Sequence, residues 1–353
     1  MMKQQNLWVS GDAGYDTYRI PALAVTAEGT LLAFCEGRVA NSSDAGDINL
    51  LVKRSTDDGE TWSDQQVIWN DNGNTCGNPA PVVDGESGVI SLLTTWNRGD
   101  DEEPSIIAQT SKDTRRVYVT RSNDDGLSWS EPAEITDDVK RPDWTWYATG
   151  PGAGIQIEHG HHAGRLVVAC DHIEAGTEQY YSHVIYSDDG GASWELGGSS
   201  PAPQTNESEV VELTGDRLLL NMRNYDRSTH SRQITISEDG GVTWRDQRFD
   251  PALIESICQA SIRRHSWPGP NGPGVILFSN PASETEREKM TVRGSFDEGQ
   301  SWPLSGVLNP GPSAYSDLTL IGEDGQIGCL YECGDSRPYE RITMARFYLS
   351  WLH

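Results

Sequence analysis

The octapeptide STDDGETW at residues 55–62 is the first of five copies of one pattern, Ser-x-Asp-x-Gly-x-x-Trp. Around the copies, short apolar runs are bounded by glycine, aspartate, asparagine and proline, and no stretch keeps the period of an amphipathic helix. The chain is therefore predicted to be all-β, with each copy forming the turn after a strand. The five copies span residues 55–62, 122–129, 187–194, 237–244 and 295–302.

Each position of this pattern, which we call the Asp box, has a local structural reason. Ser55 and Asp57 can hydrogen-bond backbone groups of their own turn, and Gly59 supplies a positive φ. Trp62 can then pack back over the hairpin and bury a large apolar surface. An acidic turn also suggests calcium, but no copy continues into a calcium loop that ends in glutamate. We therefore expect structural turns without metal.

The spacing of the Asp boxes predicts the architecture. Successive copies start between 50 and 67 residues apart, which leaves room for about four short strands in each repeat. Dividing 353 residues by six gives about 59 per repeat, so we predict a six-bladed β-propeller with five Asp-box turns. The C-terminal run Ile342–Leu349 would join the N-terminal blade to close the ring. Because no linker interrupts the chain, residues 1–353 are expected to form a single domain.

The charge balance excludes some classes of partner. The chain has 53 Asp and Glu residues against 27 Lys and Arg residues, a formal net charge of −26. A general nucleic-acid or anionic-membrane binder needs a basic surface, so neither partner is expected. Only five of the 27 cationic residues are lysines, which leaves 22 arginines.

Terminal and cysteine patterns give weaker expectations. No stretch approaches the roughly 18 apolar residues of a membrane span. Residues 1–6 carry no apolar run typical of a signal peptide, so the chain as written is expected to be cytoplasmic; a removed leader would make it secreted or periplasmic instead. The six cysteines are scattered, mostly within apolar runs, and are expected to be free, buried thiols.

Eight further segments are more specific than the Asp boxes. Together and in this order they resemble the sialidase (neuraminidase) family of exo-acting glycoside hydrolases, in its bacterial form. The resemblance implies exo-α-sialidase activity, with retaining hydrolysis of terminal α-linked sialic acid from sialylated glycans or glycoconjugates through a tyrosine nucleophile. The segments are Tyr18–Leu23, Glu36–Arg38 followed by Asp44, Gly77–Pro79, Thr149–Gly152, Asn206–Ser208, Asn221–Arg223, Ala314–Leu318 and Leu330–Glu332.

The resemblance implies a clamp for the substrate carboxylate. Arg19, Arg223 and Arg287 match the three arginines that bind it, and Glu332 matches the acidic partner that orients Arg19. Arginine suits this role because its planar fork pairs bidentately with a carboxylate and stays charged. Arg293 is the alternative third arginine, but Arg287 is preferred because it opens the strand that leads into the last Asp box.

The resemblance also implies the reacting groups. Asp44 matches the acid/base, Tyr315 the nucleophile and Glu207 the base that activates the tyrosine. Asp47 is the alternative to Asp44. Glu209 is the alternative to Glu207, since residues two apart share a strand face.

A tyrosine nucleophile has a physical reason. A carboxylate nucleophile would approach a carbon that already carries a carboxylate, and two like charges about 4 Å apart repel by about 4 kcal/mol at an effective dielectric of about 20. A neutral phenol avoids this repulsion, provided that a base such as Glu207 takes its proton. Asp44 must be protonated when substrate binds, so some desolvation of its carboxyl is expected.

The surroundings of these residues carry further expectations. By the resemblance, Arg38 and Asn78 lie near C4 and the N-acetyl side of the sugar ring. Trp144 and Trp146 precede Thr149 and either line the site or pack in the core.

No metal or cofactor is expected. Residues 158–162, EHGHH, suggest a zinc site, but a glycine-flanked turn between strands favours a solvated loop. No phosphate-binding glycine motif precedes a helix, and no serine nucleophile elbow is present.

Three alternative functions stay open at this point. A trans-sialidase would use the same residues and transfer the sugar to an acceptor. An enzyme that prefers the deaminated sugar Kdn would differ around Asn78 and the segment Asp171–His172. A non-catalytic sialic-acid-binding propeller would be expected to lack the pair Tyr315 and Glu207, and the sequence contains both.

Overall fold

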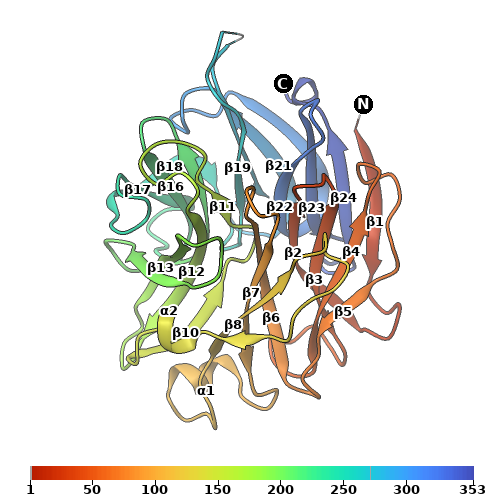
Figure 1. Ribbon diagram of the computed structural model, residues 1–353, viewed down its shortest axis with the longest axis vertical. Helices are drawn as coiled ribbons and strands as arrows, with labels where there is room; N and C mark the ends of the chain where they lie inside the picture. The colour runs from red at the N-terminus through yellow and green to blue at the C-terminus, as the bar shows by residue number, and fades with distance from the viewer. Residues whose placement is uncertain (1, 271) are drawn as a thin grey trace.

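The computed structural model describes residues 2–270 and 272–353, and its regular elements are almost all β-strands (Figure 1). The exceptions in this part of the chain are two short helices, α1 (Glu103–Ile107) and α2 (Thr136–Val139), and the 3-10 turn η1 (Leu349–Trp351). The all-β prediction is confirmed. None of these described helices has the length and apolar character needed to cross a membrane.

Hydrogen bonds join the strands into sheets of eight, five, four and seven strands. The eight-stranded sheet contains two successive antiparallel sets, which one parallel bridge between Ile48 and Thr75 connects. The first set is β2 (Thr17–Val25), β3 (Leu31–Arg38), β4 (Ile48–Ser55) and β5 (Gln66–Trp69); the second is β6 (Thr75–Val83), β7 (Ile90–Asn97), β8 (Arg116–Ser122) and β9 (Ala133–Glu134).

The five-stranded and four-stranded sheets are the third and fourth sets, and in both of them neighbouring strands are antiparallel. The third set is β10 (Trp144–Thr149), β11 (Ile155–Gln156), β12 (Leu166–Glu174), β13 (Tyr180–Ser187) and β14 (Glu195–Ser199); the fourth is β15 (Thr205–Leu213), β16 (Arg217–Asn224), β17 (Ser231–Ser237) and β18 (Arg245–Ile254).

The seven-stranded sheet holds the last two sets, because the long strand β22 (Leu304–Ile321) pairs with β21 through its first half and with β23 through its second. β24 pairs with the N-terminal strand β1, so the two ends of the chain do meet (Figure 1). The predicted direction of the exchange was wrong, because the C-terminal strand stays in the last set and the N-terminal strand β1 is added to that set rather than β24 to the first. The remaining strands are β19 (Ser261–Ser266), β20 (Val275–Pro281), β21 (Glu288–Ser295), β23 (Gln326–Cys333), β24 (Arg341–Phe347) and β1 (Lys3–Val9).

Apolar faces of successive sets pack against one another and form the core. Val82 and Leu93 of the second set share one buried cluster with Val168 and Ile185 of the third. Burial of these faces is the main stabilising contribution, at roughly 25 cal/mol per Å² of apolar surface removed from water. All six cysteines are buried and free, as predicted.

The Asp boxes are closed by side-chain hydrogen bonds that repeat in all five copies. Gly59 N donates to Ser55 Oγ at 2.9 Å, and Ser55 Oγ donates to Asp57 Oδ1 at 2.8 Å. Thr61 donates to Asp57 through both its backbone N and its hydroxyl, at 2.8 and 2.6 Å. These bonds, with those from Thr61 largest, lower the pKa of Asp57 to about 2. A hydroxyl at the position before tryptophan is thus a fifth part of the box that the sequence pattern left out.

The Asp boxes and the ends of the second strands lie on opposite faces of the molecule. Each box follows the third strand of its set, as Ser55 ends β4 and Ser122 ends β8. The second strand runs antiparallel to the third, so Arg38 at the end of β3 lies at the other edge. The face away from the boxes therefore collects the ends of β3, β7, β12 and β16, together with the starts of β2, β6, β10 and β15.

Candidate active site

A cavity of about 310 Å³ opens on the face away from the Asp boxes. Eight of the nine residues predicted for the site line it, and the ninth, Glu332, lies directly behind Arg19. Residues that were alternatives, namely Asp47, Glu209 and Arg293, do not line it. The full lining is Arg19, Ile20, Glu36, Arg38, Ser42, Asp44, Asn78, Glu103, Arg115, Trp146, Ala148, Asp171, Asn206, Glu207, Arg223, Tyr225, Arg287, Tyr315 and Tyr339.

Glu332 fixes both Arg19 and the backbone beside it. Arg19 Nε donates to Glu332 Oε1 at 2.7 Å, and the backbone N of Ile20 donates to the same oxygen at 2.9 Å. The register of β2 against β3 shifts after Arg19, and Ile20 has φ of 59°, an unfavourable value for a β-branched residue. Glu332 Oε2 also accepts from the backbone N of Tyr315 at 3.0 Å. One buried carboxylate thus positions the arginine and the tyrosine together.

Tyr315, Glu207 and Arg223 form a connected group. Tyr315 Oη donates to Glu207 Oε1 at 2.6 Å, and Arg223 Nη1 lies 3.1 Å from the same hydroxyl. Arg223 also pairs with Glu207 Oε2. Burial, followed by the charge of Glu207, raises the pKa of Tyr315 well above its ordinary value, although Arg223, Arg287 and Arg19 oppose the shift. The phenol is therefore neutral, with its proton directed at a carboxylate.

Arg19 and Arg287 approach the ring of Tyr315 and complete a cluster of three arginines. The guanidinium carbons of Arg19 and Arg287 lie 5.0 and 5.6 Å from the centroid of that ring. Arg287 donates to Tyr339 Oη at 2.7 Å and to the carbonyl of Ile257 at 3.1 Å. Neither contact is to a carboxylate, so Arg287 keeps its full charge available to an anion in the cavity.

Asp44 lies at the mouth of the cavity with its side chain 67% exposed. It pairs with Arg38 Nη1 at 2.7 Å and with Arg19 Nη1 at 3.8 Å. Desolvation raises the pKa of Asp44, but the charges of Arg38 and Arg19 outweigh it and hold the pKa below its usual range. The desolvation anticipated from the sequence is therefore present, but beside these two arginines it does not keep the group protonated.

Arg38 and Asn78 are held by partners within the protein. Glu36 Oε2 accepts from Arg38 at 2.6 Å, and Glu36 Oε1 accepts from the backbone N of Asn78 at 2.8 Å. Asn78, with φ of 53°, stands in a register shift like that of Ile20. Its Oδ1 accepts from Thr95 Oγ1 at 2.9 Å and from Arg115. Glu36 therefore holds the backbone at Asn78 in the second set, as Glu332 holds the backbone at Ile20 in the first.

Sequence reasoning missed several lining residues. Arg115 and Glu103 carry no motif, since the topology alone brings the end of β7 and the start of β8 to this face. Asp171 was named from the sequence only within the segment Asp171–His172, where an enzyme that prefers Kdn would differ, and the structure places it in the cavity lining. Asn206 could have been found, because it begins a segment already identified as specific. Of the two tryptophans left open, Trp146 lines the cavity, whereas Trp144 stacks on His172 with ring centroids 3.4 Å apart.

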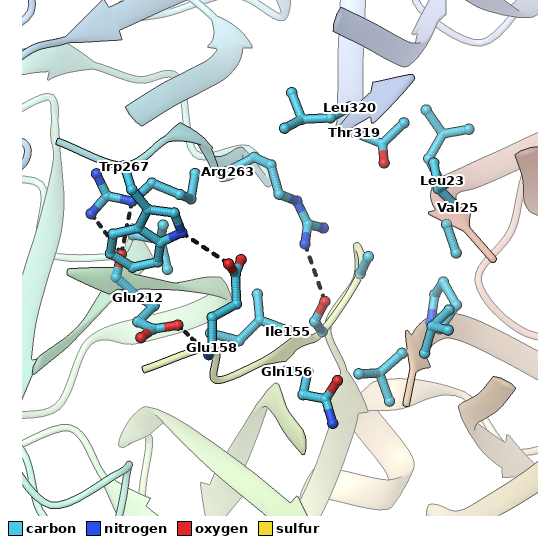
Figure 2. Close-up of a pocket in the computed structure, with 18 residues that line it drawn as sticks. Leu23, Val25, Ile155, Gln156, Glu158, Glu212, Arg263, Trp267, Thr319 and Leu320 are labelled. Atoms are coloured by element: carbon cyan, nitrogen blue, oxygen red, sulfur yellow. Dashed lines mark hydrogen bonds between the residues drawn. The ribbon is translucent and has the colours of Figure 1, made fainter. Parts of the chain in front are cut away.

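A second cavity, of about 350 Å³, lies at the other ends of the first strands (Figure 2). Its charged groups are engaged with protein partners. Arg263 donates to the carbonyls of Leu318 and Gly154 at 3.1 and 3.2 Å, and Arg264 pairs with Glu298 at 2.8 Å. Glu158 accepts from Trp267 Nε1 at 2.9 Å. The arrangement offers no free acid, base or nucleophile comparable to the first cavity.

The residues 158–162 do not assemble a metal site. His159 packs edge-on against Trp267, and His161 Nδ1 lies 2.6 Å from Asp216. Over residues 2–270 and 272–353, no group of three or more His, Cys, Asp or Glu side chains is placed to hold a metal ion.

Comparisons with known proteins show the family to which the chain is similar. A family model described as a BNR repeat-like domain matches residues 29–329. A sialidase of Micromonospora viridifaciens is 37% identical over 361 residues, and this match covers 99% of this chain and 54% of the relative. An exo-alpha-sialidase of Aspergillus fumigatus is 30% identical over 377 residues, and this match covers 98% of this chain and 87% of the relative. The chain thus spans about half the length of the bacterial relative. The structure of a Hadza microbial sialidase superposes with a TM-score of 0.88 at 30% identity, covering 99% of this chain and 69% of that one.

Proposed function

This chain belongs to the sialidase family, and we propose that it is an exo-α-sialidase, which releases terminal α-linked sialic acid from glycans or glycoconjugates with net retention of configuration. The observation that carries the proposal is the hydrogen bond of 2.6 Å from Tyr315 Oη to Glu207 Oε1, beside three arginines. It supplies a nucleophile with its base next to a binding site for a carboxylate.

Binding begins with the substrate carboxylate at Arg19, Arg223 and Arg287. Arg19 and Arg223 are already oriented by Glu332 and Glu207, so little side-chain entropy remains to be lost when the anion binds. The chain as a whole repels an anion, with its net charge of −26. These local arginines overcome that repulsion, because the field of distant charges is screened over about 8 Å at physiological salt.

In the first step, Tyr315 Oη attacks the anomeric carbon as Glu207 takes the phenolic proton. The bond to the leaving oxygen breaks, and Asp44 delivers a proton to that oxygen. Because the attacking group is neutral until its proton leaves, it avoids the repulsion that a carboxylate nucleophile would meet. Arg223 contacts both Tyr315 Oη and Glu207, so it stabilises the negative charge that passes between them.

In the second step, Asp44 deprotonates a water molecule that attacks the same carbon from the face the aglycone has left. The bond to Tyr315 breaks, and Glu207 returns the proton to the phenolate. Two displacements at one carbon give net retention. The sugar leaves with the hydroxyl group from water, and every side chain regains its starting protonation state.

Substrate binding would prepare Asp44 for its role as an acid. Arg38 and Arg19 hold the pKa of Asp44 below its usual range. A substrate carboxylate at Arg19 neutralises part of that positive field, so the pKa of Asp44 rises in the complex. The same binding event thus holds the substrate and favours protonation of the group that assists its leaving oxygen.

The proposed framework for this chemistry is a single-domain, six-bladed β-propeller formed by residues 1–353. The six antiparallel sets and the pairing of β24 with β1 support a closed ring. Further support comes from the lining of the second cavity, to which β2, β6, β11, β15, β19 and β22 each contribute residues (Figure 2). In such a ring, the starts of the first strands surround the active site.

The test is release of a fluorophore from 4-methylumbelliferyl α-N-acetylneuraminide, followed by proton NMR of the first sugar anomer formed. We expect turnover with the α-anomer appearing first. Binding without turnover would instead support a non-catalytic lectin. If added lactose diverted the product from free sugar to sialyllactose, the proposal would change to a trans-sialidase.

A further inference from the structure

We propose that Gln259 is a positioning residue for the nucleophile, because its side-chain amide holds the backbone of Ser316 and thereby sets the direction of the Tyr315 hydroxyl. The inference rests on the proposed sialidase function and adds to it a residue outside the cavity lining. Gln259 is fully buried and is not among the residues that line the cavity. Any effect of Gln259 on the reaction must therefore pass through the strand that carries Tyr315.

Strand β22 is irregular where it carries the nucleophile. Its register against β23 shifts between Ser313 and Ser316, so Tyr315 has no partner residue in that ladder. Irregularities of this kind re-aim a side chain and are frequent beside active sites. The peptide groups around Tyr315 must find partners outside the ladder, because a buried N–H or C=O group left unpaired is costly. The direction of the Tyr315 side chain therefore depends on those other partners.

Two buried side chains supply the partners. Glu332 Oε2 accepts from the backbone N of Tyr315 at 3.0 Å. Gln259 bonds both backbone groups of the next residue: its Oε1 accepts from Ser316 N at 3.0 Å, and its Nε2 donates to Ser316 O at 2.9 Å. A glutamine amide suits this pair because it carries an acceptor and a donor side by side, whereas a carboxylate can only accept. Gln259 thus pairs with Ser316 as a neighbouring strand would.

The amide of Gln259 is itself anchored by other strand sets. Its Nε2 also donates to the carbonyl of Pro151 at 3.1 Å and lies 3.4 Å from Glu209 Oε1. Pro151 belongs to the third set and Glu209 to the fourth. Because the amide nitrogen is engaged by these groups as well as by Ser316, its orientation is fixed by the surrounding sets rather than by β22 alone.

The same edge of β22 is held again two residues further along the strand. Ser261 Oγ accepts from Leu318 N at 3.0 Å, and Arg263 Nε donates to Leu318 O at 3.1 Å. The contact at Leu318 is separated from the nucleophile, whereas the contact made by Gln259 adjoins it. Loss of the bond at Leu318 should therefore loosen the strand, and loss of the bonds at Ser316 should also redirect Tyr315.

The direction of Tyr315 matters because transfer of its proton needs a short contact. Tyr315 Oη lies 2.6 Å from Glu207 Oε1 and 3.1 Å from Arg223 Nη1. The hydroxyl stands at the end of a long side chain, so a small rotation of the backbone moves it much further. Displacement of a reacting group by about 1 Å can cost about a hundredfold in rate. Among the described residues, Gln259 bonds none of the three arginines, so binding of the substrate carboxylate should be spared.

The experiment replaces Gln259 with methionine, which keeps the length of the side chain and removes both hydrogen bonds to Ser316. On the fluorogenic sialoside, we expect kcat per folded molecule of Gln259→Met to fall about tenfold or more. The inhibition constant of 2-deoxy-2,3-didehydro-N-acetylneuraminic acid, an unreactive carboxylate ligand, should stay within about threefold of the parent value.

Gln156→Met is the matched control, with parental kcat expected. Gln156 also bonds backbone groups through both ends of its amide, but it lines the second cavity. Its Oε1 accepts from Gly85 N at 2.8 Å, and its Nε2 donates to Gly164 O at 3.0 Å.

Two further variants test the proposal even if Gln259→Met fails to fold. Gln259→Glu keeps the shape of the side chain. As a neutral acid it can accept from Ser316 N and donate to Ser316 O, but as a carboxylate it can only accept. Burial favours the neutral form at low pH, and Glu209 is the titratable group among the hydrogen-bond partners of Gln259. The kcat of Gln259→Glu relative to the parent chain should therefore fall as the pH rises. Ser261→Ala removes the bond to Leu318 N and should lower the melting temperature without lowering kcat.

Each result supports or overturns the proposal. In a folded Gln259→Met variant, a fall in kcat smaller than about tenfold would overturn it. An equal loss of inhibitor affinity would also overturn it, because Gln259 would then support the whole cavity rather than Tyr315. A kcat for Gln259→Glu in constant ratio to that of the parent chain across pH, or an equal loss of kcat in Ser261→Ala, would have the same meaning. If the parent chain itself failed to hydrolyse the sialoside, the proposed hydrolase function would be overturned, and the positioning role with it.

Discussion

Two cavities of similar size, about 310 and 350 Å³, lie near opposite ends of the first strands, and both contain arginines and carboxylates. They differ in how those charges are used. At the end near the Asp boxes, a carbonyl accepts from Arg263 and the indole of Trp267 donates to Glu158 (Figure 2). Arg264 there pairs with the carboxylate of Glu298. At the other end, Arg287 has no carboxylate partner among residues 2–270 and 272–353, and Tyr315 directs its hydroxyl at a base. Size therefore does not distinguish an active site from a void, but charges left free for a ligand do.

The largest effect should come from Tyr315→Phe. Removing the hydroxyl removes the nucleophile but keeps the ring on which Arg19 and Arg287 lie, so the fold should survive. We expect kcat/KM on a fluorogenic sialoside to fall at least about a thousandfold. Tyr186→Phe, a tyrosine outside the cavity, should keep normal activity. If Tyr315→Phe turned over substrate nearly as fast as the parent chain, the first cavity would not owe its activity to the Tyr315 hydroxyl, and the proposed distinction between the two cavities would be wrong.

Asp44→Asn should cause a smaller loss that depends on the leaving group. An alkoxide needs a proton in order to leave, so sialyllactose hydrolysis should slow by about a hundredfold or more. A phenolate leaves unaided, so the fluorogenic glycoside should lose less than about tenfold. Equal losses on both substrates would exclude Asp44 as the acid.

The pH profile gives Asp44 a second test. Activity that requires a protonated Asp44 is present at low pH and is lost as the pH rises through the pKa of this group. Arg38 and Arg19 lower that pKa in the free protein, and substrate charge raises it in the complex. The fall in activity with rising pH should therefore occur at lower pH in the profile of kcat/KM than in the profile of kcat. This fall should disappear in Asp44→Asn. Coincident falls in the parent chain would contradict this account.

Asp57→Ala tests the Asp-box face and should change stability rather than chemistry. Its hydrogen bonds lower the pKa of Asp57 to about 2, against about 3.9 for an unfolded chain. A carboxyl group whose pKa is lower in the folded protein stabilises the fold when the pH is above the pKa of that group in the unfolded chain. The contribution is lost as the pH falls through the pKa of the group in the folded protein. The melting temperature of Asp57→Ala should thus lie below that of the parent chain near neutral pH, with the gap closing between about pH 4 and about pH 2. A lower kcat per folded molecule would be unexpected.

The smallest effect should come from Arg263→Gln in the second cavity. Because Arg263 donates to backbone carbonyls and does not line the cavity that contains Tyr315, kcat/KM should stay within about twofold of the parent value. A loss of more than tenfold, with the melting temperature unchanged, would mean that the second cavity takes part in activity.

The fold was largely accessible from the sequence because its information is local and repeated. Ser55, Asp57 and Gly59 close their turn within five residues, and the same pattern in five places implies repeating units of sheet. The hydroxyl of Thr61 was missed because serine and threonine alternate there between copies.

The site was accessible only where a residue stands in a specific segment. Arg19 and Tyr315 belong to such segments, so their meeting in one cavity was foreseeable. Arg115 has no such context, and only the pairing of β7 with β8 brings it to the same face. Asp171 was named from the sequence only within the segment Asp171–His172, and the pairing of β12 with β10 places it in the cavity. Nor could the sequence reveal that Arg38 and Arg19 lower the pKa of Asp44, since that depends on distances of 2.7 and 3.8 Å.

The central claim is that Tyr315 forms a covalent bond to the anomeric carbon, and trapping that intermediate tests it most directly. A 2,3-difluoro sialic acid should react, because fluoride at C2 is a good leaving group, and the fluorine at C3 slows the hydrolysis that follows. Peptide mass spectrometry of the quenched protein should then find the sugar on Tyr315, and none on Tyr315→Phe. Inactivation with the label on Glu207 or Asp44, or rapid turnover with no labelled peptide, would contradict the account.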